Sequence, residues 1–126
     1  MMSDARAING LRVLIVEDEF LLALSLEDDL ALAGCVTIGP FSNLADATQA
    51  TRREDFDLAI LDVNLGGEPI YPLAEELLAR GKPFLLVTGY GAESLPPHFR
   101  SLPRLPKPYD VAILLKEIGR ALPTVG

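Results

Sequence analysis

The stretch DLAILDVNLGG at residues 57–67 decides the fold that we expect for this chain. Five residues suited to a buried strand, Leu58–Asp62, end in a carboxylate, and two glycines follow at positions 66 and 67. A short apolar run bounded by turn residues is typical of a strand covered on both faces of a parallel sheet. Such a strand would bring Asp62 to the edge of the sheet at which the strands end.

On both sides of this strand, apolar runs of strand length alternate with longer amphipathic segments. The expected strands are Leu11–Val16, Cys35–Gly39, Leu58–Asp62, Pro83–Thr88 and Arg104–Pro106. The expected helices run from Glu19 to Ala33, from Leu44 to Glu54, from Ile70 to Arg80, and from Tyr109 or Asp110 to Leu122. This alternation predicts an α/β fold, a single-domain doubly wound five-stranded parallel sheet in the flavodoxin-like order 2-1-3-4-5.

The composition limits the classes of protein to which the chain can belong. Its 126 residues are enough for one domain, which we place at residues 9–123 after a flexible N-terminal tail at 1–8. The net charge of −7 argues against binding to nucleic acid, which needs clustered Lys and Arg. The single cysteine, Cys35, and the lack of a signal peptide or membrane-length apolar run favour a cytoplasmic protein with no membrane partner.

The segment between Thr88 and Lys107 breaks the alternation. It contains Gly89, Gly91 and four prolines, and proline both lacks the amide hydrogen of a helix and disfavours helical backbone in the residue before it. We therefore expect a loop with at most one short turn, so that the fourth helix is short or absent.

Polar side chains stand at the ends of the expected strands. Glu17 and Asp18 follow the first strand, Asp62 and Thr88 end the third and fourth, and Lys107 follows the fifth. Because ligands of open parallel sheets bind beyond the carboxyl ends of the strands, these five side chains should share one rim. The sequence thus predicts a site of three carboxylates, a hydroxyl and an ammonium.

Three carboxylates at one rim are costly without a cation. At separations of about 4–5 Å and an effective dielectric of about 20, each pair repels by about 3–4 kcal/mol, or about 10 kcal/mol in total. A divalent metal would relieve this repulsion, and an all-oxygen ligand set favours Mg²⁺, which commonly binds carboxylates together with a phosphate. A carboxylate can also act as a nucleophile toward phosphorus and form an aspartyl phosphate.

The motifs VLIVEDE, AILDVNLGG, LLVTGYG and PKPY occur in this order, and with them the chain resembles a response-regulator receiver domain of two-component signalling from about Asn9 to Pro123. The resemblance implies that Asp62 accepts a phosphoryl group. It also implies that Asp18 and Asp62 bind Mg²⁺, with Glu17 acting through water and Asn64 giving its backbone carbonyl.

The resemblance assigns Thr88 and Lys107 to the hydroxyl and lysine positions of the family and implies a cis bond before Pro108. Receivers usually carry an aromatic residue three positions before the lysine, where this chain has Arg104. Tyr90, two residues after Thr88, is the available aromatic, and we assign a switch role to Thr88 and Tyr90. The TGYG motif resembles a receiver subgroup with a Phe-Ala-Thr-Gly-(aromatic)-Gly signature and a shortened fourth helix, although Leu86 and Val87 replace its first two residues.

Each of these residues also has a simpler explanation when it is taken alone. Asp18 could be the N-cap of the first helix, Glu17 and Glu19 a solvated acidic turn, and Lys107 an ordinary surface lysine. Tyr90 could be a loop aromatic that covers apolar neighbours. The joint placement of the acidic, hydroxyl and ammonium groups at successive strand ends favours the site.

The expected function is a stand-alone, phosphorylation-dependent signalling switch. A sensor histidine kinase would be the phosphate donor, an unknown downstream protein the partner, and Mg²⁺ the cofactor. The chain would not be a conventional enzyme, because it would catalyse only its own phosphotransfer and its own slow hydrolysis. Two alternatives are a phosphatase that works through an aspartyl phosphate, although Asn64 cannot act as the general acid, and a receiver-like interaction module that is never phosphorylated.

Overall fold

The structure is a computed structural model that describes residues 8–123, and within them five parallel strands form one sheet in the order β2-β1-β3-β6-β7. The strands are β1 (Arg12–Val16), β2 (Val36–Phe41), β3 (Leu58–Asp62), β6 (Phe84–Thr88) and β7 (Arg104–Pro106). When these five strands are numbered 1 to 5 along the chain, their order in the sheet is the predicted 2-1-3-4-5. The doubly wound, flavodoxin-like fold is therefore confirmed.

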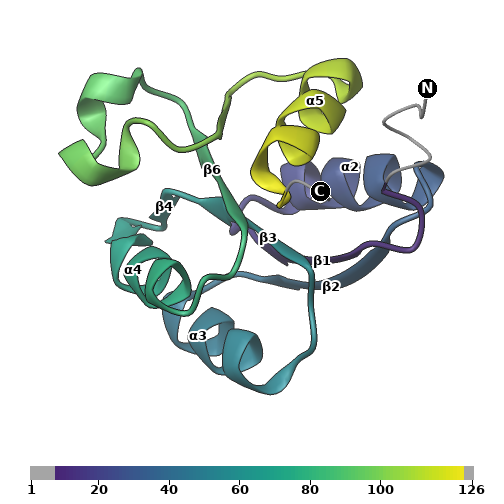
Figure 1. The fold of residues 1–126 in the computed structure, drawn as a ribbon, viewed down its shortest axis with the longest axis horizontal. Helices are drawn as coiled ribbons and strands as arrows, with labels where there is room; N and C mark the ends of the chain where they lie inside the picture. Colours follow the sequence, from purple (N-terminus) through teal and green to yellow (C-terminus); the bar gives the residue numbers. More distant parts are fainter. Residues whose placement is uncertain (1–7, 124–126) are drawn as a thin grey trace.

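Four α-helices cover the two faces of this sheet. One face carries α2 and α5 and the other carries α3 and α4 (Figure 1). Their bounds, which lie within one or two residues of the predicted ones, are α2 (Phe20–Leu32), α3 (Leu44–Arg53), α4 (Tyr71–Ala79) and α5 (Val111–Ala121). Asn43 caps α3 by accepting the Asp46 N–H at 2.8 Å, and Asp110 caps α5 by accepting the Ile113 N–H at 2.9 Å.

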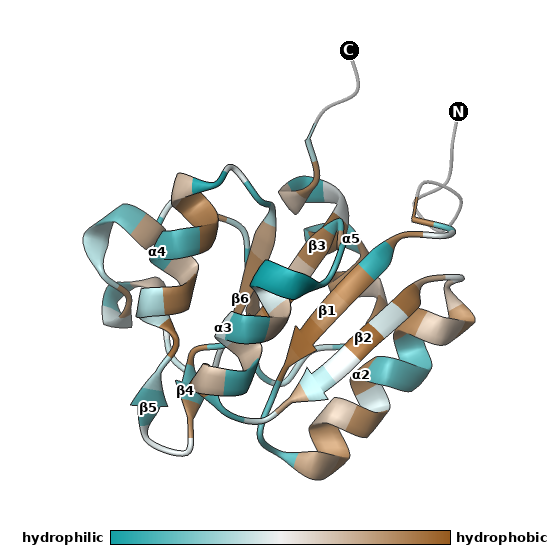
Figure 2. Cartoon of the chain, turned by 90° about the horizontal axis from the view of Figure 1, so that it is seen from below, coloured by the Kyte–Doolittle hydropathy of each residue, from teal (hydrophilic) through white to brown (hydrophobic). Residues whose placement is uncertain are grey.

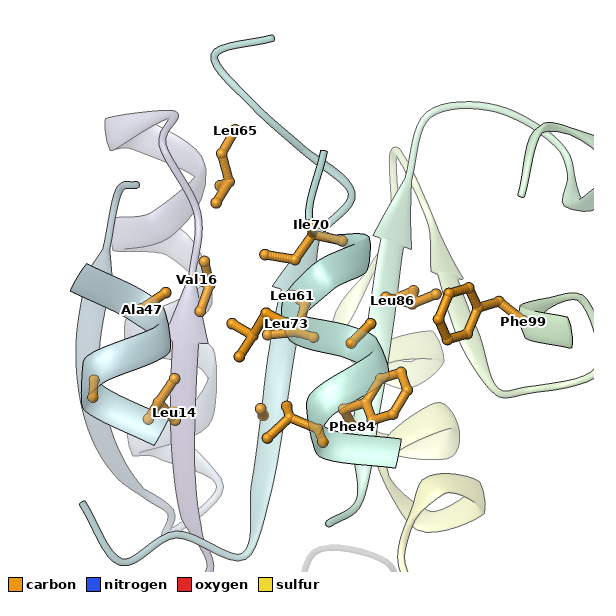
Figure 3. Packing of buried hydrophobic residues seen from close by; sticks show 14 of the residues in the cluster. Leu14, Val16, Ala47, Leu61, Leu65, Ile70, Leu73, Phe84, Leu86 and Phe99 are labelled. Carbon is orange, nitrogen blue, oxygen red and sulfur yellow. The ribbon is translucent and has the colours of Figure 1, made fainter. Parts of the chain in front are cut away.

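The central strands are buried along their whole length. Every residue of β3 and β6 is buried, and Figure 2 shows these strands as largely hydrophobic ribbons inside the molecule. Successive residues point to opposite faces, so Leu61 packs toward α3 and α4 while Ile60 packs toward α2 and α5. Figure 3 shows the hydrophobic core on the face covered by α3 and α4, in which Leu61, Leu73 and Leu86 lie together. This burial holds the end of β3 rigidly in place.

A small hairpin that the sequence analysis did not predict follows β3. Its strands are β4 (Asn64–Leu65) and β5 (Glu68–Pro69), which pair in antiparallel fashion. Gly66 and Gly67 are the two central residues of the turn, with φ of 59° and 91°. Glycine adopts such positive φ values without strain. The hairpin places the residues after Asp62 over the end of the sheet.

Two short 3₁₀ turns replace a helix between β6 and β7. They are η1 (Ala92–Ser94) and η2 (Pro97–Phe99), so the prediction that the fourth helix is short or absent is confirmed, while the expectation of at most one turn is wrong. The Phe99 side chain is fully buried, and its ring stacks on Tyr71 with the centroids 5.8 Å apart. Figure 3 shows Phe99 in the core beside Leu86, so this segment is held to the sheet by a buried aromatic side chain.

Three further expectations concern the chain ends and the membrane. Residues 1–7 of the predicted tail lie outside the described residues, but Ile8, its last member, is only 1% exposed and packs into the core, so the tail does not extend to residue 8. The Lys107–Pro108 bond is cis, as the resemblance implied. Among the helices between residues 8 and 123, none has both the length and the apolar character needed to cross a bilayer.

Candidate functional site

The predicted site residues meet at the ends of the parallel strands. Glu17 follows β1, Asp62 and Thr88 end β3 and β6, and Lys107 follows β7. Because the strands are parallel and hydrogen-bonded side by side, their ends lie at one edge of the sheet. They line one cavity of about 860 Å³, to which Asp18, Asn64 and Tyr90 also contribute.

The three carboxylates of the site are close together and differ in exposure. One oxygen each from Glu17, Asp18 and Asp62 lies within 4.8 Å of the others. Glu17 and Asp62 are only 4% and 5% exposed, whereas Asp18 is open to solvent. Burial, and then the hydrogen bond to Asp62, raises the pKa of Glu17 to about 8.

This arrangement fits a hard divalent cation. The donors are carboxylate oxygens, the ligands that Mg²⁺ prefers, and the exposed Asp18 leaves the site open to water molecules that Mg²⁺ usually retains. The raised pKa of Glu17 shows that the carboxyl group is costly to ionise beside Asp62 when no cation is present. The acidic cluster thus has the ligand types of a magnesium site, and a bound cation would relieve the repulsion between its carboxylates.

Lys107 is the cation that the chain itself supplies. Its Nζ donates to Asp62 Oδ2 at 3.1 Å and lies 3.6 Å from Glu17 Oε1. Burial lowers the pKa of Lys107, but the hydrogen bond and charge of Asp62, with the charge of Glu17, outweigh this and raise the pKa overall. The backbone N–H of Lys107 also donates to the Thr88 carbonyl at 2.9 Å, which ties β7 to β6.

Two residues after the strand, Asn64 fixes the turn around Asp62. The Asn64 N–H donates to Asp62 Oδ1 at 3.2 Å, and its side-chain Oδ1 accepts the Gly67 N–H at 2.7 Å. Asp62 therefore has one oxygen held by a backbone amide and the other by the Lys107 ammonium. Such contacts set the orientation of a buried carboxylate.

The Thr88 hydroxyl is bonded to the loop that follows it. Its Oγ1 accepts the Tyr90 N–H at 3.1 Å and donates to the Tyr90 carbonyl at 3.3 Å. The Tyr90 side chain extends into solvent, and the residue is 77% exposed. The interpretation of Tyr90 as a cover for apolar neighbours is therefore wrong.

The simpler explanations of the acidic and basic residues do not hold either. The N-cap of α2 is Glu19, which makes no side-chain capping bond, so Asp18 is not the cap. Glu17 is buried and is not part of a solvated turn, although Glu19 is exposed at the rim of the cavity. Lys107 is partly buried against two carboxylates.

Several residues near the site were missed by sequence reasoning. Tyr71, Ser94 and Pro69 line the cavity, but they come from the first turn of α4, from η1 and from the hairpin, and only the fold reveals their proximity. Tyr109 lies beside the acidic cluster, where burial, followed by the charges of nearby carboxylates, raises its pKa to about 12. Its position in the PKPY motif was the only sequence signal for it.

Arg104, which stands where receivers usually carry an aromatic, begins β7. Its backbone lies beside Leu86 of β6, and its Nη1 donates to the Arg100 carbonyl at 3.4 Å. The side chain is therefore directed to the segment between η2 and β7. It supplies a charge where an aromatic ring would be expected.

Comparison with solved structures gives close matches over most of the chain. SdrG from Sphingomonas melonis Fr1 is 38% identical, with 95% of this chain and 98% of that chain covered and a TM-score of 0.80. The BeF₃-activated conformation of SdrG, there assigned to Pseudomonas melonis Fr1, is also 38% identical, covers 88% of this chain and 96% of that chain, and has a TM-score of 0.76.

Two further solved structures are similar at lower identity. The PhyR response regulator REC domain of Erythrobacter litoralis is 27% identical, with coverage of 95% and 99% and a TM-score of 0.78. A CheY-like response regulator receiver domain from Methylobacillus flagellatus is 25% identical, with coverage of 88% and 98% and a TM-score of 0.76. No family model matches the chain, and no curated protein matches it.

Proposed function

The chain belongs to the family of response-regulator receiver domains, and from this we propose that it is a signalling switch that accepts a phosphoryl group on Asp62. The observation that carries the proposal is the environment of Asp62. Its buried carboxylate lies 3.1 Å from the Lys107 ammonium and within 4.8 Å of oxygens from two further carboxylates. An acidic cluster of this kind is suited to a cation and a phosphoryl group together.

In the proposed reaction an Asp62 oxygen attacks the phosphorus of the donor. A carboxyl O–P bond forms, the bond from phosphorus to the leaving group breaks, and that bond's electron pair departs with the leaving group. Lys107, which now donates to Asp62 Oδ2, would donate to the phosphoryl oxygens instead. A bound Mg²⁺, held by Asp18 and Asp62 with Glu17 acting through water and the Asn64 carbonyl as a further ligand, would neutralise charge on the transferring group.

The proposed donor is a sensor histidine kinase, and the proposed reader is a downstream protein that distinguishes the phosphorylated surface. SdrG, the 38% identical relative, has been described in a BeF₃-activated conformation, which supports activation by a phosphoryl-like group at a carboxylate. The chain would then act stoichiometrically, with self-phosphotransfer and slow autodephosphorylation as its only chemistry. We place it in the cytoplasm, since its single cysteine forms no disulfide.

Thr88 and Tyr90 are the proposed switch. In the structure the Thr88 hydroxyl is bonded to the backbone of Tyr90. A phosphoryl group on Asp62 would offer this hydroxyl a charged acceptor, and hydrogen bonds to charged acceptors are the stronger ones. Thr88 would then turn toward the phosphoryl group and release Tyr90, which changes the surface that follows β6.

Labelling with a small acyl phosphate and Mg²⁺, followed by intact-mass measurement, tests the phosphoacceptor. The wild-type protein should gain one phosphoryl group, and Asp62→Asn should gain none. Asp55→Asn is the matched control, because Asp55 is exposed and its side chain makes no hydrogen bond within residues 8–123. Full labelling of Asp62→Asn would show that the site is wrong, and rapid multiple turnover on a phosphomonoester would favour a phosphatase.

An unlabelled wild-type protein would favour the third alternative, an interaction module that is never phosphorylated. Its carboxylates would then serve only to hold a cation. The contact of Lys107 with Asp62 argues against this, because an ammonium competes with a bound cation for the Asp62 carboxylate, whereas it can donate to a phosphoryl group on Asp62.

A further inference from the structure

Two arginines lie on the segment between β6 and β7 without a carboxylate partner. Arg100 follows η2 and Arg104 begins β7, and neither forms a salt bridge with any residue between 8 and 123. Four other arginines of the described chain do pair with a glutamate, namely Arg52, Arg53, Arg80 and Arg120. Arg12 also forms no salt bridge within these residues and donates to the Asp55 carbonyl, so the feature that distinguishes Arg100 and Arg104 is that two such arginines are neighbours in a chain with a net charge of −7.

The Arg100 guanidinium donates hydrogen bonds to backbone carbonyls instead. Its Nε donates to the Leu95 carbonyl at 3.0 Å and its Nη2 donates to the Glu93 carbonyl at 3.2 Å. Both carbonyls belong to η1 or to the residue that ends it. These two bonds use two of the five N–H donors of the exposed guanidinium, so the Nη2 donor that holds the Glu93 carbonyl becomes available to another molecule only if η1 moves.

The segment has one fixed half and one weakly held half. Residues 95–103 are fixed by Leu95 and Phe99, which are buried, and by the stack of Phe99 on Tyr71. His98 adds a contact of 2.7 Å between its Nε2 and Glu75 Oε1 of α4. Residues 89–94 have no buried side chain and are held at their start by the Thr88 hydroxyl.

These contacts connect Thr88 to Arg100. The Thr88 hydroxyl holds Tyr90, only Gly91 separates Tyr90 from η1, and η1 supplies the Glu93 carbonyl that Arg100 binds. Loss of the Thr88 contact would release residues 89–94, while Arg100 would stay in place beside the buried Phe99 ring. This movement would free Arg100 Nη2 from the Glu93 carbonyl, while the bond from Nε to the carbonyl of the buried Leu95 would remain.

We propose that Arg100 and Arg104 form a docking site for an acidic segment of a partner protein, and that phosphorylation opens this site by withdrawing η1 from Arg100. The inference rests on the proposed function, since the phosphoryl group on Asp62 is what draws Thr88 away. Guanidinium groups bind carboxylates through two parallel hydrogen bonds, so Arg100 is suited to Asp or Glu side chains.

Charge complementarity favours an acidic segment of a partner protein as the ligand of this site. The strong net negative charge of the chain repels acidic peptides in general, so attraction must come from a local group of cations. Arg104 contacts the backbone of Arg100, with its Nη1 3.4 Å from the Arg100 carbonyl, and adds a second positive charge to the same segment. Before phosphorylation the bonds to Glu93 and Leu95 compete with any carboxylate that approaches.

The inference is tested by the binding of a fluorescein-labelled oligoglutamate peptide. Fluorescence polarisation would be measured at low salt with Mg²⁺, with and without beryllofluoride. Beryllofluoride should tighten binding about fivefold, which is near the upper limit for one exposed ion pair. Arg100→Ala should remove this gain, and Arg104→Ala should reduce it about twofold. The arginine side-chain N–H signal of Arg100 in an NMR spectrum should also shift when beryllofluoride binds.

Lys116→Ala is the matched control. Lys116 is an exposed cation on α5 that makes no salt bridge within residues 8–123, so its removal lowers the net charge equally and should leave the gain intact. An equal loss in the lysine and arginine variants would reduce the effect to net charge and overturn the inference. An oligoglutamine peptide should show no gain in any variant.

Loading of beryllofluoride is followed separately by its bound ¹⁹F signal, which Asp62→Asn should abolish. Loading without tighter peptide binding or a shifted Arg100 signal would refute the docking site alone. Absence of loading would refute the proposed function, and the docking site with it.

Discussion

Glu17→Gln should make the stability of the metal-free protein nearly independent of pH over a range in which the wild-type protein loses stability. Burial, and then the hydrogen bond to Asp62, raises the pKa of Glu17 from 4.5 to about 8 in the folded chain. Between these two values the unfolded chain has released the proton and the folded chain still holds it. The folded state then binds more protons, so its stability falls as the pH rises.

The size of this effect follows from the displacement of the pKa. A carboxyl group whose pKa moves from 4.5 to about 8 on folding loses about 5 kcal/mol of stability once the pH exceeds the higher value. The stability contributed by neutral Glu17 is complete below pH 4.5 and is lost through pH 8. Since a domain of this size is stable by about 5–15 kcal/mol, the loss should be large enough to measure easily.

Urea denaturation in the presence of a chelator, at a series of pH values from about 5 to about 9, measures this slope. His98, the only histidine, lies 2.7 Å from Glu75, so the comparison should be repeated in a His98→Asn background. Saturating Mg²⁺ should flatten the wild-type slope, because a cation stabilises the ionised carboxylates. A wild-type stability that rises with pH, or a slope unchanged by Glu17→Gln, would refute the reasoning.

Three further changes have distinct expected results. Lys107→Ala leaves buried Asp62 without its ammonium partner at 3.1 Å and should cost about 3 kcal/mol in metal-free urea denaturation at neutral pH; an unchanged midpoint would contradict the ion pair. Phe99→Ala should cost about 3–5 kcal/mol because its ring is fully buried, whereas Tyr90→Ala, at an exposed position, should change stability by less than about 0.5 kcal/mol; equal losses would argue against the packing described. Thr88→Val should abolish the tyrosine fluorescence change on adding beryllofluoride, a signal that can be read because the chain has no tryptophan; persistence of the change would remove Thr88 from the switch.

Much of the fold was accessible from the sequence because the central strands carry strong local signals. The observed bounds of β3 are those predicted, since Leu58–Asp62 is a continuous apolar run between polar turns. The helix α5 was found from its apolar spacing, whereas the capping role of Asp110 is seen only in the structure. The convergence of the site residues at one edge of the sheet could be predicted from the order of the strands and from the general rule that ligands of parallel sheets bind beyond the carboxyl ends of the strands.

Other features depend on tertiary contacts that leave no local pattern. The β4–β5 hairpin has two residues in each strand, which is too short for a periodic signal. Apolar composition alone would also assign Phe20 and Leu32 to the core, yet they are 76% and 89% exposed. The direction of the Thr88 hydroxyl, toward Tyr90, is set by loop geometry that the sequence does not encode in any single motif.

Chemical mapping of the phosphorylated residue tests the central claim most directly. Protein labelled by a small acyl phosphate with Mg²⁺ would be reduced with borohydride, which converts an aspartyl phosphate to a homoserine residue, and then digested for peptide mass analysis. We expect the conversion at Asp62, at the end of the β3 peptide, and at no other aspartate. Conversion at Asp18, or a phosphate ester on a hydroxyl residue such as Thr88, would contradict the assignment of Asp62 as the acceptor.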